Sequence, residues 1–239
     1  MISGDAFVQR LRALAARVPF DLDVQPGATA ADFDRWPVPV PSTARELLGR
    51  LGGFTVPPVE FVLTGHPRQA GDHGVPHPHW LVTDDGGGGV TWVDIEADGR
   101  WGQVLMQYRE GGLFVEADSL PHWVDRLIGT AEDLVDGTGF EEGLQPYADD
   151  FWDLLQLDGP ELPLHPAAEL RTAPGCDPVV AGLAARVPDG ALIADLRGAV
   201  PGSRARFDRA LRRYRLDRAV GGPVFAAVPR DAAPDPTGP

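Results

Sequence analysis

Hydrophobic residues near the start of the chain recur at the spacing of an amphipathic helix. They share one face of a helix that ends before Pro19: Val8, Leu11, Leu14, Ala15 and Val18. A second stripe, over residues 44–51, follows a Thr43 to Glu46 pair with the spacing of a capping box and stops at Gly52-Gly53. The pattern predicts two helices before residue 54.

Short runs rich in β-branched and aromatic residues come next, and each predicts a strand. They span residues 60–64, 80–83, 90–95, 103–109 and 113–117. Asp98-Gly99 and Gly111-Gly112 lie between the later runs and favour tight turns, so consecutive antiparallel hairpins are expected. Apolar residues from 120 to 135 return to the helical period, and this helix is expected to cover one face of the sheet.

The remaining residues have a less regular pattern. A helix over residues 146–157 would carry Tyr147, Phe151 and Leu154 or Leu155 inward. After it come an alanine-rich segment at 179–187 and apolar runs at 191–196 and 224–228. Between these runs, a predicted arginine-rich helix follows Pro201-Gly202, with an inward stripe of Phe207, Ala210, Leu211 and Tyr214.

The order of elements predicts an α+β fold with a mixed, mainly antiparallel sheet flanked by helices, plus a small α/β C-terminal extension. The expected units are a domain at 1–137, an acidic helix and linker at 138–166 and a small α/β unit at 167–230. Residues 231–239 are rich in Pro, Ala and Asp, and a disordered tail is expected there.

Charge and composition narrow the classes of function. The 239 residues include 35 acidic and 21 basic side chains, all of the latter arginine, for a net charge of −14. Without lysine, the chain cannot form a Walker phosphate loop, a Schiff-base lysine or a Ser-x-x-Lys nucleophile. The net charge disfavours nucleic acid and anionic membranes as partners, although eight arginines and only two aspartates lie within residues 197–218.

The apolar runs, the first residues and the cysteine content indicate the cellular location and the redox chemistry to expect. No apolar run approaches the roughly 18 residues of a membrane helix, and the first residues do not have the pattern of a signal peptide, so a cytoplasmic protein is expected. The single cysteine, Cys176, excludes an internal disulfide, and we interpret it as a bystander thiol.

The segment from His66 to His79 carries the strongest enzyme-like signal. His73, His77 and His79 are close enough in sequence to converge on a metal ion, with Asp72 or His66 in support. The segment is rich in Pro and Gly and has no helical His-Glu-x-x-His frame, so a loop between two strands is the competing interpretation. A metal-dependent hydrolase or metal-binding protein therefore stays an alternative.

Other motifs do not complete a catalytic site. Asp94 to Gly99 begins like a calcium-binding loop, but the twelfth position is Leu105, which supplies no carboxylate. The glycines at 86–89 are followed by neither a Lys-Ser/Thr pair nor a predicted helix, and there is no Gly-x-Ser-x-Gly nucleophile elbow. No enzyme activity and no cofactor are expected.

Three segments resemble the SMI1/KNR4 family of the SUKH superfamily. The first, from Pro41 to Phe54, is similar to the proline-led helix of that family, which closes on a glycine. The second runs from Val93 to Val104, and the third, from Phe114 to Val124, is similar to the late strand that leads into an Ala-Asp-Ser-Leu helix start. The resemblance covers about residues 5–137.

The resemblance implies an α+β fold and no catalytic set. It also implies a protein-binding role, most concretely that of a bacterial immunity protein that binds and neutralises a toxin domain. An acidic surface fits a basic toxin because complementary charge speeds association. The expected contact residues are Glu132, Asp133, Asp136, Glu141 and Glu142, with Trp152 as an aromatic anchor. A regulatory scaffold that recruits other proteins is the remaining alternative.

Overall fold

The computed structural model describes residues 3–56, 59–64, 74–84, 89–108, 111–137, 151, 154–155, 157–207 and 214–230. Up to residue 137 the elements are α1 (Gly4–Ala15), β1 (Val24–Pro26), α2 (Ala30–Phe33), α3 (Ser42–Leu48), β2 (Leu51–Val56), β3 (Val59–Val62), β4 (His79–Asp84), β5 (Val90–Ile95), β6 (Trp101–Tyr108), β7 (Gly112–Ala117) and α4 (Leu120–Gly137). Beyond it they are β8 (Leu164–Pro166), α6 (Ala167–Thr172), α7 (Pro178–Arg186), β9 (Leu192–Asp195), β10 (Arg204–Arg206), β11 (Tyr214–Arg218) and β12 (Val224–Pro229).

The described strands form three sheets, in which every ladder is antiparallel. A small sheet has the order β1-β2-β3, a five-stranded sheet the order β10-β7-β6-β5-β4, and a four-stranded sheet the order β11-β12-β9-β8. The predicted α+β class with antiparallel sheets is confirmed. Strands β4 to β7 form the predicted meander.

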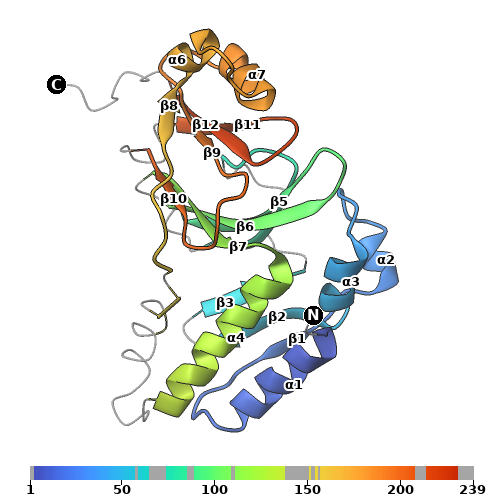
Figure 1. Cartoon of the computed structure of the whole chain (residues 1–239). Helices are drawn as coiled ribbons and strands as arrows, with labels where there is room; N and C mark the ends of the chain where they lie inside the picture. Colours follow the sequence, from blue (N-terminus) through green and yellow to red (C-terminus); the bar gives the residue numbers. More distant parts are fainter. Residues whose placement is uncertain are drawn as a thin grey trace, which may run out of the picture.

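The helices and sheets are arranged in layers (Figure 1). Three groups of buried side chains lie between these layers. The first group lies between helices α1, α3 and α4 and the strands of the small and five-stranded sheets. The second fills the space between the five-stranded and four-stranded sheets, with Trp92 on one side and Phe225 on the other. The third lies under α6 and α7, where Leu183 meets Ile193. The four-stranded sheet is therefore buried on both faces.

The predicted N-terminal helix and the long helix after the meander are both present. The Ser3 hydroxyl caps α1 by accepting a hydrogen bond from the Ala6 N–H at 3.3 Å. Phe7, Leu11 and Leu14 of α1 are at most 1 % exposed and belong to the same buried group as Leu127 of α4. The predicted apolar stripes therefore form the contact between these two helices. No helix among the described residues is long and apolar enough to cross a membrane.

The Gly52-Gly53 pair was expected to end a helix, but both residues lie within β2. Added Cβ atoms would meet backbone oxygens of the neighbouring strands, at 2.1 Å from Pro26 for Gly52 and at 2.4 Å from Phe61 for Gly53. The two glycines therefore allow the neighbouring strands to approach closely. The helical spacing of the preceding leucines did not predict this role.

The arginine-rich helix predicted after Gly202 is wrong where the structure describes it. Residues 204–206 form β10 and residues 214–218 form β11, while 208–213 lie outside the described residues. Ala205 is fully buried, whereas Arg204 and Arg206 on either side of it are not. This is the two-residue alternation of a strand. Pairing with the edge of β7 supplies backbone hydrogen bonds that local sequence cannot predict.

The C-terminal unit is not α/β in the predicted sense, because its described strands pair antiparallel. Phe151 and Leu155 of the predicted acidic helix are buried as expected, and Leu154 is 58 % exposed. Residues 146–150 and the predicted tail lie outside the described part of the chain. The unit boundaries stay predictions, with β10 adding a C-terminal strand to the N-terminal sheet.

Alanine substitutions at Gly99 and Gly182 test the backbone conformation at these two positions, because they should change stability in opposite directions. Gly99 has a φ of +83°, and an added Cβ would lie 2.4 Å from Pro39 Cγ, so Gly99→Ala should lower the free energy of unfolding by about 1–3 kcal/mol. Gly182 lies in α7 with no described atom within 4 Å of an added Cβ, so Gly182→Ala should raise it by up to about 1 kcal/mol. Denaturant unfolding measures both. Equal effects of the two substitutions would contradict this description of the turn at Gly99.

Candidate functional site

Polar side chains lie side by side on the face of the five-stranded sheet that meets the four-stranded sheet. His79 of β4 is directly opposite Asp94 of β5 in the ladder, so the two project from the same face. Gln103 of β6 donates a hydrogen bond to the carbonyl oxygen of Ala199 at 2.9 Å, across the space between the sheets. This polar row borders the apolar group around Trp92.

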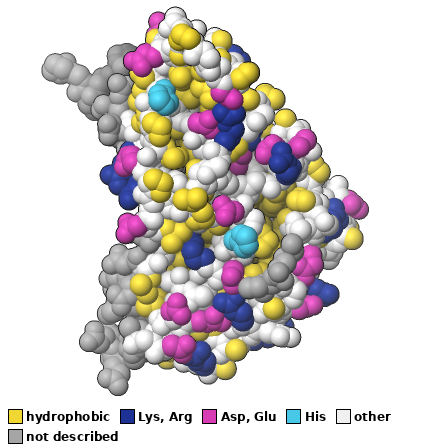
Figure 2. Space-filling view, viewed as in Figure 1, with side chains coloured by type: hydrophobic (Ala, Val, Ile, Leu, Met, Phe, Trp, Pro, Cys, Tyr) yellow, Lys and Arg dark blue, Asp and Glu magenta, His cyan; other side chains and the backbone are white. Residues whose placement is uncertain are grey.

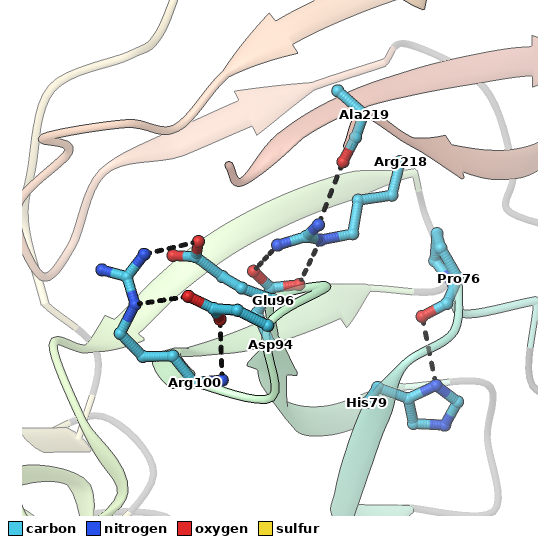
Figure 3. Close-up of polar contacts among 8 residues, drawn as sticks. Pro76, His79, Asp94, Glu96, Arg100, Arg218 and Ala219 are labelled. Atoms are coloured by element: carbon cyan, nitrogen blue, oxygen red, sulfur yellow. Dashed lines mark hydrogen bonds and ion pairs between the residues drawn. The ribbon is translucent and has the colours of Figure 1, made fainter. Parts of the chain in front are cut away.

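Asp94 forms an ion pair with Arg218 of β11 that joins the two sheets (Figure 3). Nε and Nη2 of Arg218 each donate to one carboxylate oxygen of Asp94 at 2.7 Å, and Nη1 donates to the carbonyl of Ala219 at 3.0 Å. The side chains of Arg218 and Asp94 are 5 % and 3 % exposed. We call this bidentate pair the inter-sheet clamp.

Two opposing effects act on the pKa of the Asp94 carboxyl group in the clamp. Burial raises the pKa of Asp94 above its usual value, because the charged form loses its hydration, and the guanidinium of Arg218 opposes that shift. Both carboxylate oxygens are engaged and almost fully shielded from solvent. The arrangement therefore suits a structural contact, in which the charge holds two sheets in register, rather than proton transfer to a substrate.

A second buried carboxylate, on the helix side of the molecule, is engaged by an arginine through one of its oxygens. Arg126 of α4 pairs with Glu116 of β7, and its Nη1 donates to the carbonyl of Leu155 at 3.0 Å. Burial raises the pKa of Glu116, and the charge of Arg126 opposes this shift. One arginine thus fixes α4, the sheet and the chain that follows α4 to one another.

The turn at the rim of the clamp matches the sequence interpretation. Arg100 pairs with Glu96 at 2.7 Å, and its backbone N–H donates to the Asp98 side chain at 3.0 Å (Figure 3). The Gly99 N–H donates to the Glu96 carbonyl at 2.8 Å. Asp94 to Gly99 is therefore a strand end and a turn, as predicted. Its first carboxylate binds an arginine.

Only part of the histidine segment is described. The rings of His77 and His79 stack with centroids 4.5 Å apart, and Nδ1 of the buried His79 lies 3.2 Å from the carbonyl oxygen of Pro76. Since a carbonyl oxygen only accepts, this contact places a proton on Nδ1. His66, Asp72 and His73 lie outside the described residues, within which no three metal-ligating side chains are grouped. The metal site stays a prediction.

The residues predicted to contact a partner fall into three groups: paired within the chain, exposed without an ion pair, and outside the described part. Glu132 and Asp136 of α4 are paired within the chain: Arg10 of α1 donates to both oxygens of Glu132, at 3.0 Å and 2.6 Å, and Arg17 pairs with Asp136. Asp133 is exposed and forms no ion pair with the described residues. Glu141, Glu142 and Trp152 lie outside the described part.

These pairs change the charge of the α4 surface. Figure 2 shows acidic and basic side chains next to one another over the part of the molecule formed by α1 and α4. Glu132 and Asp136 hold α1 against α4, and Arg10 is shared between Glu132 and Asp125, so Arg10 and Arg17 offset only part of the acidic charge of α4. Asp133 is the predicted contact residue, among those described, whose charge is open to a partner.

Sequence reasoning missed the inter-sheet clamp. Asp94 is a lone charge between Val93 and Ile95 in a strand that is buried throughout, which is a signal for a buried partner. The partner lies 124 residues further along the chain, just beyond the stripe that was interpreted as a helix. Nothing in the local pattern connects the two.

Comparisons with known proteins leave the family open. Scans against protein-family models, curated protein sequences and solved structures each found no match to this chain.

A double-mutant cycle tests the clamp. Arg218→Met or Asp94→Leu alone should lower the free energy of unfolding by about 3–5 kcal/mol, because each leaves one buried charge without its partner. The double variant should recover most of this loss, since two apolar side chains replace two charges. Strictly additive losses in denaturant unfolding at neutral pH would rule out the coupling.

The same variants have a defined pH dependence. Without Arg218, burial alone acts on Asp94 and its folded pKa rises further above the unfolded value of 3.8, so protonation stabilises the fold. The deficit of Arg218→Met relative to Asp94→Leu/Arg218→Met should be larger at pH 7 and shrink as the pH falls toward about 4. A deficit that is independent of pH would show that Asp94 is not buried as a charge.

Proposed function

We propose that this chain is a non-catalytic protein-binding module, most specifically an immunity protein of the SMI1/KNR4 type that neutralises a toxin domain. The observation that carries the proposal is the charge. Its 35 acidic residues exceed its 21 arginines by 14, so at least fourteen carboxylates have no arginine of their own. Such a surplus favours fast association with a basic partner.

Several features of the fold support this proposal. The order of helices, antiparallel strands and a long helix from α1 to α4 agrees with what the resemblance to the SMI1/KNR4 family implies. Among the described residues that form ion pairs, the two most buried carboxylates, on Asp94 and Glu116, are each engaged by an arginine within the fold. Asp133, in contrast, is exposed and forms no ion pair with the described residues, so it can steer a partner without giving up a structural role.

The proposed interface lies on the exposed side of α4 and the chain that follows it. Asp133 can receive a basic side chain of the partner directly. Glu132 and Asp136 are half-buried or exposed but already paired, so they contribute less unless Arg10 and Arg17 are displaced. Glu141, Glu142 and Trp152 complete the proposed contact set.

Affinity capture at low and moderate salt, with the bound proteins identified by mass spectrometry, tests the function. We expect a toxin domain in a stoichiometric, salt-sensitive complex, and co-expression of this chain should abolish its toxicity. Specific capture of non-toxic proteins would favour the regulatory scaffold instead. Near-stoichiometric zinc in the purified protein, lost when His73, His77 and His79 are replaced by alanine, would favour the metal-dependent alternative.

Charge reversal then locates the interface. Asp133→Arg should slow association with the captured partner by about threefold at low salt and by less at high salt, because it removes attraction and adds repulsion. Asp23→Arg is the matched control, since Asp23 is an exposed acid that precedes β1 on another part of the fold. If the two variants behave alike in stopped-flow or biosensor kinetics, the α4 surface is not the interface.

A further inference from the structure

Strand β11 ends the four-stranded sheet and pairs with β12 on one side only, among the described strands. The Ala219 N–H donates to the Val224 carbonyl at 2.8 Å, in the register that places Leu216 opposite Ala227. Hydrogen-bonded and non-hydrogen-bonded pairs alternate along an antiparallel ladder. Asp217 and Arg215 therefore point their backbone groups toward β12, and Leu216 points its N–H and C=O away from it.

A contact at the end of β11 agrees with this alternation of backbone directions. Nη2 of Arg186 donates to the carbonyl oxygen of Arg218 at 3.2 Å, and Arg218 has the same backbone direction as Leu216. Among the described residues, no hydrogen bond uses the outward N–H or C=O of Leu216. Among the described residues, the middle of the strand edge therefore leaves one donor and one acceptor available to another strand.

The side chains next to Leu216 are charged, and their order makes the strand complementary to itself. Arg215 and Asp217 project from the same face, where they pair with each other at 2.6 Å and are 54 % and 27 % exposed. In an antiparallel pair centred on Leu216, each Arg215 lies opposite Asp217 of the second copy. Both cross-strand contacts then join opposite charges, which stabilises such a pair.

We propose that β11 is a homodimerisation edge, at which two copies of this chain pair antiparallel about Leu216. Leu216 of each copy donates its N–H to the Leu216 carbonyl of the other, and the two four-stranded sheets become continuous. The Arg218 carbonyl accepts a second hydrogen bond beside that from Arg186, which its two lone pairs permit. The second copy is the occupant because it carries the matching charge order in the matching direction.

Charge substitution separates this pairing from other modes of association. Sedimentation of the full chain at about 0.15 M salt should show a reversible dimer. Arg215→Asp and Asp217→Arg should each weaken dimerisation about tenfold or more, because symmetry places two like-charge contacts in every mutant dimer. The double swap Arg215→Asp/Asp217→Arg restores both contacts and should return the dissociation constant to within about threefold of the original.

A matched control comes from the exposed Arg35–Asp32 pair, which lies at α2. Arg35→Asp changes the net charge as Arg215→Asp does and should leave the dimer unchanged. A monomer at all concentrations would overturn the proposal. So would a dimer that is insensitive to both single substitutions, or one that Arg35→Asp weakens equally.

Disulfide trapping tests the register independently of charge. In a Cys176→Ser background, Arg215→Cys protein mixed with Asp217→Cys protein brings the two thiols opposite each other at a non-hydrogen-bonded pair. The mixture should form a covalent dimer under mild oxidation much faster than either protein alone. Equal rates in all three samples would contradict the proposed register, even if the protein is dimeric.

Discussion

A carboxylate taken out of water must find a cation, and in this fold that requirement ties two sheets together. Asp94 lies in the most buried strand of the five-stranded sheet, and Arg218 reaches it from the four-stranded sheet with two 2.7 Å hydrogen bonds. A pair this deep contributes little net stability relative to apolar side chains of the same size. It does make other placements of the sheets costly, because any shift leaves two charges unpaired.

The rest of the architecture depends on that placement. Docking the four-stranded sheet buries Trp92 and Phe225 in one apolar group and leaves the opposite face for α6 and α7. It also brings β10 to the edge of β7, so a C-terminal segment completes an N-terminal sheet. The second buried pair, Arg126 with Glu116, secures α4 and the chain after it in a similar way. The exposed acids of α4 thus lie on a helix that is tied to its neighbours.

Local patterns were sufficient to predict α1, α4 and the meander of β4 to β7, because their apolar patterns are continuous, but they did not predict β1, α2 or β2. They were insufficient where packing between distant segments decides the structure. Gly52 and Gly53 act through the approach of neighbouring strands, and Ala205 lies in a strand only because β7 is there to pair with it. The acids of α4 were found from composition alone, but the pairing of Glu132 with Arg10 depends on how α1 docks. That docking also leaves Asp133 as the open charge.

Proton exchange at the Arg218 side chain tests the central claim, that a closed ion pair joins the two sheets, most directly. The Arg218 Nε–H is expected to give its own resonance in NMR spectra of the native protein. It should exchange with water at least about 100-fold more slowly than the Nε–H of the exposed Arg35, because it is buried against Asp94. Similar exchange rates for the two arginines would contradict the claim, since they would place the Arg218 guanidinium in solvent and leave the sheets without their clamp.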